Sequence, residues 1–194
     1  TPSAAVLFGN ETNDEPGFVG RLGLSNLPGA LFGARLGVSY ATGAFYSNNV
    51  AMSADRRNED FDQIVWGYDG EYSIGRFVVR SEGVWNSWQL PGNDDPARWL
   101  PDEVEANAFF VESAVKLMPG ATLGARYDQI NFDEITGPTG RTQAWDANVR
   151  RVEGAFSFRP AREWEIRVAY QNWWYPDEPA LDADMAGFQL RMDF

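Results

Sequence analysis

The segment MAGFQLRMDF, from Met185 to Phe194, decides how the rest of the chain is interpreted. Its apolar side chains occupy every second position: Ala186, Phe188, Leu190, Met192 and Phe194. The positions between them carry Gly187, Gln189, Arg191 and Asp193. Successive side chains of a β-strand point to opposite faces. The period of two therefore predicts a strand with one apolar and one polar face.

The same alternation recurs along the chain and predicts an all-β protein of about ten antiparallel strands. Strands are predicted at 18–25, 31–46, 64–72, 76–86, 109–117, 123–128, 151–158, 164–171 and 185–194, with a weaker one at 4–8. Short turns at 27–30, 73–75, 119–120 and 159–162 alternate with long polar connections at 47–60, 90–102, 133–146 and 176–184. An up-and-down barrel has this alternation of short turns and long loops.

Composition excludes several classes of function. The chain has no cysteine and no histidine, which removes disulfides, thiolate chemistry, histidine-based catalytic triads and histidine-ligated zinc. The formal net charge of −12 argues against nucleic acid as a partner. No spacing of carboxylates singles out a catalytic pair, so we expect no enzyme activity, no metal site and no cofactor. No run approaches the roughly 18 apolar residues of a membrane helix.

A strand of alternating residues that ends on phenylalanine resembles the C-terminal strand of bacterial outer-membrane β-barrels. This resemblance implies that Phe188, Leu190, Met192 and Phe194 form the signal for barrel insertion. The units FVESAVKLMPGATLGARYDQINF (110–132) and VRRVEGAFSFRPAREWEIRVAYQ (149–171) resemble C-terminal hairpins of porin-like proteins, including the phosphate-selective porin O/P group. The chain is therefore expected to be a single barrel domain over residues 1–194 or the C-terminal part of a longer barrel.

The aromatic residues favour a transmembrane β-barrel over a soluble sandwich. Trp85, Trp88, Trp173, Trp174 and Tyr175 fall toward the long-loop ends of their strands. A second group falls toward the short-turn ends: Phe32, Tyr72, Phe77, Phe158, Trp164 and Phe194. Two aromatic belts match the two interfaces of a bilayer, whereas a soluble core would bury its large side chains centrally.

The face opposite the apolar one carries charges of both signs, and these are the candidate lumen-lining residues: Arg21, Arg35, Arg80, Glu82, Glu112, Arg126, Arg151, Glu153, Glu165, Arg167 and Arg191. Guanidinium groups on a channel wall present donors to anionic solutes. The same arginines can instead pair with carboxylates on neighbouring strands and fill the interior of a narrow barrel. The carboxylates expected in such pairs are Glu82, Glu112, Glu153, Glu165 and Asp128. The sequence leaves both alternatives open.

Two functional hypotheses follow. The first is a porin-like channel in the bacterial outer membrane, with a periplasmic C-terminus, for diffusion of small hydrophilic solutes, anionic ones included. The second is a non-conducting anchor barrel that binds envelope proteins through its acidic loops. Either would contact the lipid bilayer, lipopolysaccharide and the barrel-assembly machinery, with a homo-oligomer as a further option and no nucleic acid. A soluble ligand-binding β domain is a third, weaker alternative.

Clusters of carboxylates mark the long connections, namely Glu11, Asp14 and Glu15; Asp94 and Asp95; and Asp177, Glu178, Asp182 and Asp184. Carboxylate oxygens suit divalent cations that bridge lipopolysaccharide. Their spacing matches no EF-hand loop, and charge runs are usually solvated loops. We therefore expect solvent-exposed loops.

Overall fold

A computed structural model describes residues 17–25, 32–44, 61–90, 103–137 and 140–192. Several predicted features lie outside these residues: the strand at 4–8, the turn at 27–30, the loop at 47–60, most of the loop at 90–102, and Phe194 of the predicted insertion signal.

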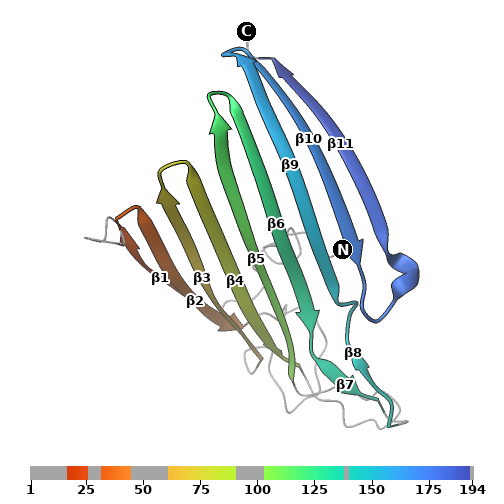
Figure 1. Ribbon diagram of the computed structural model, residues 1–194. Coiled ribbons are helices and arrows are strands. Elements are labelled where there is room, and N and C mark those ends of the chain that lie inside the picture. Colours follow the sequence, from red (N-terminus) through yellow and green to blue (C-terminus); the bar gives the residue numbers. More distant parts are fainter. Residues whose placement is uncertain (1–16, 26–31, 45–60, 91–102, 138–139, 193–194) are drawn as a thin grey trace.

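The described chain forms one large antiparallel sheet of nine strands in the order β1-β2-β3-β4-β5-β6-β9-β10-β11 (Figure 1). Each strand pairs with its neighbours along the chain, which makes the sheet an up-and-down meander. The strands are β1 (Phe18–Ser25), β2 (Ala34–Ala44), β3 (Asp62–Ile74), β4 (Phe77–Gln89), β5 (Glu103–Met118), β6 (Ala121–Phe132), β9 (Val149–Ala161), β10 (Trp164–Trp174) and β11 (Ala183–Met192). The predicted all-β, antiparallel class is confirmed.

The connections differ at the two ends of the sheet. At one end, which we call the turn end, residues 75–76, 119–120 and 162–163 join β3 to β4, β5 to β6 and β9 to β10. At the other end, the loop end, the connections are longer, and β7 and β8 lie there (Figure 1). Met192, the last residue of β11, pairs with Trp164 at the turn end. From β2 to β11 the predicted alternation of short and long connections therefore holds.

The connection at 133–146 contains two short strands that the sequence pattern did not indicate. β7 (Glu134–Thr136) and β8 (Thr142–Ala144) form a separate two-stranded sheet between β6 and β9. Trp145 follows them, and its indole N–H donates a hydrogen bond to the Glu105 carbonyl at 2.8 Å. The Trp145 ring also packs edge-on against Phe132, with ring centroids 4.8 Å apart. The end of this connection is thus tied to β5 and β6.

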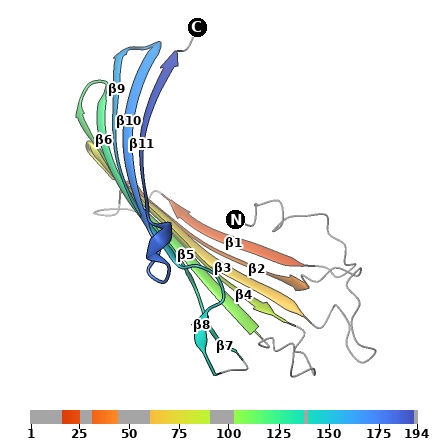
Figure 2. The same ribbon diagram turned by 90° about the vertical axis from the view of Figure 1, so that its right-hand side faces the viewer.

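The described strands do not close into the barrel that the sequence predicts. Within the part of the chain that the structure covers, β1 pairs only with β2, and β11 pairs only with β10. The twisted, curved sheet places β1 and β11 at opposite edges (Figures 1 and 2). Closure requires hydrogen bonding between the two edge strands, and the separation of these edges prevents it.

The sheet is a single layer, and its apolar side chains are consequently exposed. Among described residues, the buried hydrophobic ones are Ala34, Phe61 and Ala121 alone. Phe188 is 71% exposed, Leu22 66%, Val38 55% and Val168 50%. These four side chains share one face of the sheet, because the strand register places them on alternate positions. An apolar surface of this kind normally marks a contact with another protein or with a membrane.

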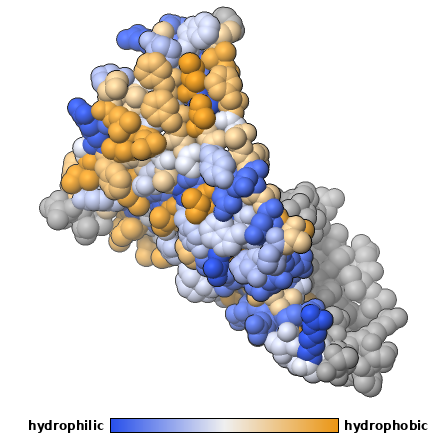
Figure 3. Space-filling model, turned by 45° about the vertical axis from the view of Figure 1, so that its right-hand side comes forward, coloured by the Kyte–Doolittle hydropathy of each residue, from blue (hydrophilic) through white to orange (hydrophobic). Residues whose placement is uncertain are grey.

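The apolar surface forms a band toward the turn end of the strands. Figure 3 shows hydrophobic surface gathered at that end and hydrophilic surface toward the loop end. On β10 the band runs from Trp164 to Tyr170, roughly 20 Å at about 3.3 Å per residue. On β5 it runs from Phe109 to Leu117, roughly 26 Å along the strand. The hydrophobic band of a membrane barrel is about 25 Å tall.

No helix within the described ranges is both long enough and apolar enough to cross a bilayer.

Candidate functional site

The register places every candidate lumen-lining residue on the same face of the sheet, opposite the apolar face. We call this the charged face. It is not uniformly polar, since Val84, Phe110 and Ile130 also lie on it. The Arg126 guanidinium lies over the Phe110 ring, with its central carbon 4.1 Å from the ring centroid. The charged face matches the prediction in position, and its role as a lumen wall stays a prediction.

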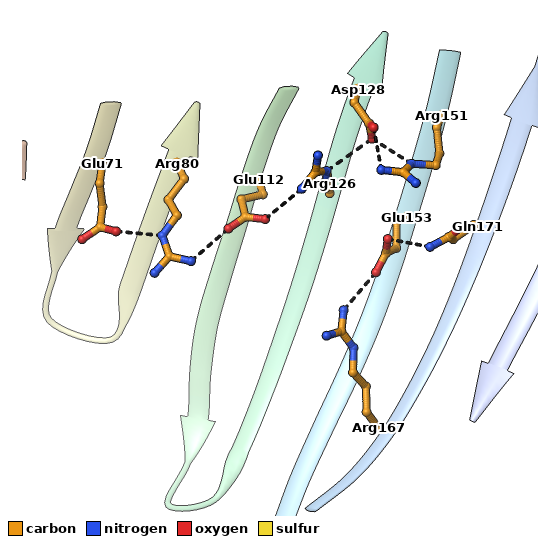
Figure 4. A network of polar contacts seen from close by, with 9 residues as sticks. All are labelled: Glu71, Arg80, Glu112, Arg126, Asp128, Arg151, Glu153, Arg167 and Gln171. Carbon is orange, nitrogen blue, oxygen red and sulfur yellow. Dashed lines mark hydrogen bonds and ion pairs between the residues drawn. The ribbon is translucent and has the colours of Figure 1, made fainter. Parts of the chain in front are cut away.

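One row of this face alternates in charge from strand to strand. Directly opposite one another in the ladder lie Arg35, Glu71, Arg80, Glu112, Arg126, Glu153 and Gln171. Arg80 donates to Glu71 at 2.7 Å and to Glu112 at 3.1 Å (Figure 4). The second oxygen of Glu112 lies 3.7 Å from Arg126. We call this row the charge ladder.

Side chains on both sides of the charge ladder extend the network of ion pairs and hydrogen bonds. Arg151 binds both carboxylate oxygens of Asp128, at 2.6 and 3.0 Å, and its guanidinium also lies over the Trp173 ring. Arg167 pairs with Glu153 at 3.0 Å, and Gln171 donates to the other Glu153 oxygen at 2.8 Å (Figure 4). Bidentate and charge-assisted contacts of this kind fix side-chain geometry.

The arginines of the central strands are therefore compensated. Arg21 pairs with Asp69 at 2.7 Å, near β1, and Arg159 pairs with Glu165 at 2.6 Å, near the turn end. The structure contains the pairing across strands, and the choice between a channel wall and a filled interior stays a prediction. Asp128 was expected as a partner, whereas Asp69 and Glu71 were not named as partners, and their period-two positions on β3 were the available signal.

Two adjoining hollows lie on the charged face toward the turn end. The first, of about 400 Å³, lies next to the ladder residues Glu112, Arg126 and Glu153. Its floor consists of small residues aligned across the strands, Ala114, Gly124 and Ala155. The second, of about 670 Å³, shares Thr122 and Ser157 with the first and continues to the β5–β6 turn. We call the second the turn-end hollow.

Two tryptophans differ from the predicted outer belt. Trp88 and Trp173 lie on the charged face. Each is an even number of positions along its strand from an arginine of that face, Arg80 on β4 and Arg167 on β10 respectively. Trp88 packs edge-on against Trp145 with ring centroids 5.8 Å apart. On the apolar face, Trp66 and Trp85 stack with centroids 4.1 Å apart. The aromatic group at the loop end is thus divided between the two faces.

Charge is sorted along the strands. The loop end carries the arginines Arg141 and Arg150 and many carboxylates, namely Asp62, Glu103, Glu105, Asp133, Glu134, Asp146, Asp177, Glu178, Asp182 and Asp184. The turn end carries the carboxylates Glu163 and Glu165 and a larger number of cations, namely Arg76, Lys116, Arg159, Arg162, Arg167 and Arg191. Within the described ranges, no group of acidic residues is arranged to hold a metal ion.

The two oxygens of Glu112 join two arginines, so its loss should weaken the ladder. We expect Glu112→Gln to lower the free energy of unfolding by about 1 kcal/mol, because partly exposed ion pairs each contribute up to roughly that amount. Glu82→Gln is the matched control, since Glu82 has no ion-pair partner among the described residues. Urea unfolding of the lipid-reconstituted protein measures both. Equal effects of the two substitutions would contradict a ladder role for Glu112.

The acidic loop end supplies a pH-dependent prediction. Desolvation of the carboxyl group, followed by the nearby Asp133 and Glu103 carboxylates, raises the pKa of the exposed residue Glu105 above its usual value. A carboxyl group with a raised folded-state pKa stabilises the fold at low pH, and that contribution is lost as pH rises through this pKa. We expect Glu105→Gln to raise the melting temperature at pH 7 and to have no effect at pH 3. An identical difference at both pH values would contradict this assignment.

Comparison with models of known protein families finds none that matches this chain. Comparison with curated proteins finds none with significant sequence similarity. The geometry of the two faces is therefore the basis for the function proposed below.

Proposed function

We propose that the chain forms part of the wall of a porin-like β-barrel in the bacterial outer membrane, through which small hydrophilic solutes diffuse. The apolar face lies against lipid and the charged face lines the interior. Further strands that pair with β1 and β11 complete the wall. The observation that carries the proposal is the single-layer sheet, apolar on one face and charged on the other.

Three features support a membrane location. The apolar side chains are exposed over nine strands, and no second layer of described residues covers them. The apolar band has about the height of a bilayer's hydrocarbon region. Backbone groups inside a bilayer must be hydrogen-bonded, and the sheet ladders meet this requirement for every strand between the two edges.

The connections suggest an orientation. Outer-membrane barrels have short turns on the periplasmic side and longer loops outside. We therefore place the turn end, including the end of β11, in the periplasm and the acidic loop end outside the cell. The apolar residues Phe188, Leu190 and Met192 of β11 would carry the insertion signal for the assembly machinery. Lipopolysaccharide and other envelope proteins are the partners we propose at the loop end.

One observation favours the alternative of a non-conducting anchor barrel. The central arginines are held in ion pairs with neighbouring strands (Figure 4), and such pairs occupy the interior of a narrow barrel. In a wider barrel the same pairs lie flat along the wall and leave the centre open. The total number of strands in the closed barrel decides between the two.

Planar-bilayer recording of the detergent-extracted protein tests the proposed function. Stable conductance steps are the expected result, and their reversal potential under a salt gradient reports which ions the wall favours. A folded, heat-modifiable protein that produces no steps would contradict the channel and leave the anchor barrel as the better account.

A further inference from the structure

Lys116 and Arg76 differ from the other cations of the charged face. Neither has a carboxylate partner among the described residues, whereas Arg80, Arg126, Arg151 and their neighbours are paired. The two residues are adjacent in space, because the Lys116 N–H donates to the Arg76 carbonyl at 2.9 Å. One Arg76 guanidinium nitrogen donates to the Leu117 carbonyl at 3.3 Å, which leaves its other donors available.

Both side chains line the turn-end hollow. Thr122 and Ser157 also line the hollow, where their hydroxyls can act as neutral hydrogen-bond donors, and so does the carboxylate residue Glu165. Arg159 also borders the hollow, but its charge is offset by Glu165 at 2.6 Å. The hollow therefore presents two uncompensated positive charges together with hydroxyl groups, in a volume of about 670 Å³. That volume accommodates a small hydrated anion with room to spare.

We infer that the turn-end hollow binds small anions between Lys116 and Arg76, and that this pair rather than the charge ladder determines the ion selectivity of the proposed channel. The role of Lys116 and Arg76 in selectivity rests on the proposed function, whereas the binding of anions in the hollow does not. The chemical class is a small oxyanion or carboxylate, because ammonium, guanidinium and hydroxyl groups are its usual donors.

The difference between paired and unpaired cations is physical. An arginine held against a carboxylate contributes a dipole, whose field falls off faster with distance than that of a single charge. An unpaired charge acts over a Debye length of about 8–10 Å at ordinary ionic strength. Walls of low dielectric constant concentrate the field further. Solutes passing the turn end therefore experience Lys116 and Arg76 more strongly than the ladder arginines.

The chain has a single lysine, which makes a direct binding test possible. We would measure the acylation rate of the Lys116 amine in the detergent-folded protein, in sodium sulfate and in sodium chloride at equal ionic strength. The Lys116→Arg variant gives the background from any other reactive group. We expect sulfate to slow acylation of Lys116, and Arg76→Gln to raise the sulfate concentration needed by roughly tenfold, the loss of one charged donor.

Arg162→Gln is the matched control, since Arg162 has the same charge, lies at the same end and is not part of the hollow. It should leave the protection by sulfate unchanged. Sulfate that protects Lys116 no better than chloride, or an Arg162→Gln effect equal to that of Arg76→Gln, would overturn the anion site.

The selectivity is read separately in planar bilayers. Acylation with a membrane-impermeant reagent, added on the periplasmic side, should shift the reversal potential of the native channel toward cations and leave the Lys116→Arg channel unchanged. Open channels whose reversal potential stays constant after acylation would overturn the role in selectivity. Protection by sulfate in a protein that forms no channels would confirm the anion site, remove its role in selectivity and refute the proposed function.

Discussion

Val168→Arg should lower the free energy of unfolding in lipid by about 2–4 kcal/mol, the cost of an arginine near the midplane on the lipid face of a barrel. Val168 lies on β10 between Phe156 of β9 and Phe188 of β11, and it is 50% exposed. Among the described residues, the carboxylate of this face on β11 is Asp184, which lies four positions from Phe188 and is already bonded to Tyr170 and Asn172. Urea unfolding of vesicle-reconstituted protein provides the measurement.

Gln171→Arg is the matched control for Val168→Arg. Gln171 lies on the charged face of the same strand and already donates to Glu153 at 2.8 Å. An arginine at this position would extend the charge ladder by one step, so we expect little loss of stability. Equal destabilisation by the two substitutions would mean that the two faces have been assigned to the wrong environments.

Gly120→Ala should also have a large effect, for a reason independent of the membrane. Gly120 has a φ of +81°, and an added Cβ would lie 2.5 Å from the Arg159 carbonyl oxygen. The Gly120 carbonyl also accepts a hydrogen bond from the Arg159 N–H at 2.8 Å, so the two backbones cannot separate without loss of that bond. We expect a lower free energy of unfolding by more than the roughly 1–2 kcal/mol of left-handed backbone strain alone.

Gly75→Ala separates these two contributions. Gly75 occupies the β3–β4 turn with a φ of +57°, and nothing lies within 4 Å of an added Cβ. It should therefore show the backbone strain without the steric clash. A Gly75→Ala protein as unstable as the Gly120→Ala protein in urea would show that the close approach of β6 and β9 at the turn contributes nothing.

The faces of the strands could be predicted from the sequence because the signal is local. Alternation of apolar and charged residues, as in Ile166, Arg167 and Val168, requires no knowledge of neighbouring strands. Pro119 and Gly120 likewise marked a tight turn by their own conformational preferences. The order of strands followed from these turns, since short connections join adjacent antiparallel strands.

Which carboxylate pairs with which arginine could not be predicted in the same way. The register of two strands determines that Glu112 faces Arg80 on one side and Arg126 on the other, and local alternation leaves the register open. Glu82 shows the same limit, because it was expected to pair and has no ion-pair partner among the described residues. The strands β7 and β8, of three residues each, are too short to show a period of two.

A closed barrel requires the two edge strands of the sheet to be joined by strand pairing. A local sequence pattern contains no information about pairing between strands that lie far apart in the chain. Each edge strand shows the alternation of a barrel strand, and neither shows which strand should pair with its free side. Trp88 and Trp173 were assigned to the outer belt because they lie near the loop end. Their alternate positions along the strands, counted from the arginines, place them on the charged face instead. The alternate position of a residue along its strand is therefore a better guide to its face than its distance from the strand end.

The most direct test of the membrane account uses single cysteines along β11, because the chain has none of its own. Cysteines at positions 186, 187, 188, 189, 190 and 191 would be labelled one at a time with an environment-sensitive fluorophore in lipid vesicles. Labels at 186, 188 and 190 should emit in the blue and be quenched by lipid-borne quenchers, whereas labels at 187, 189 and 191 should be quenched by iodide in water. Quenching by iodide at all six positions would contradict the membrane account.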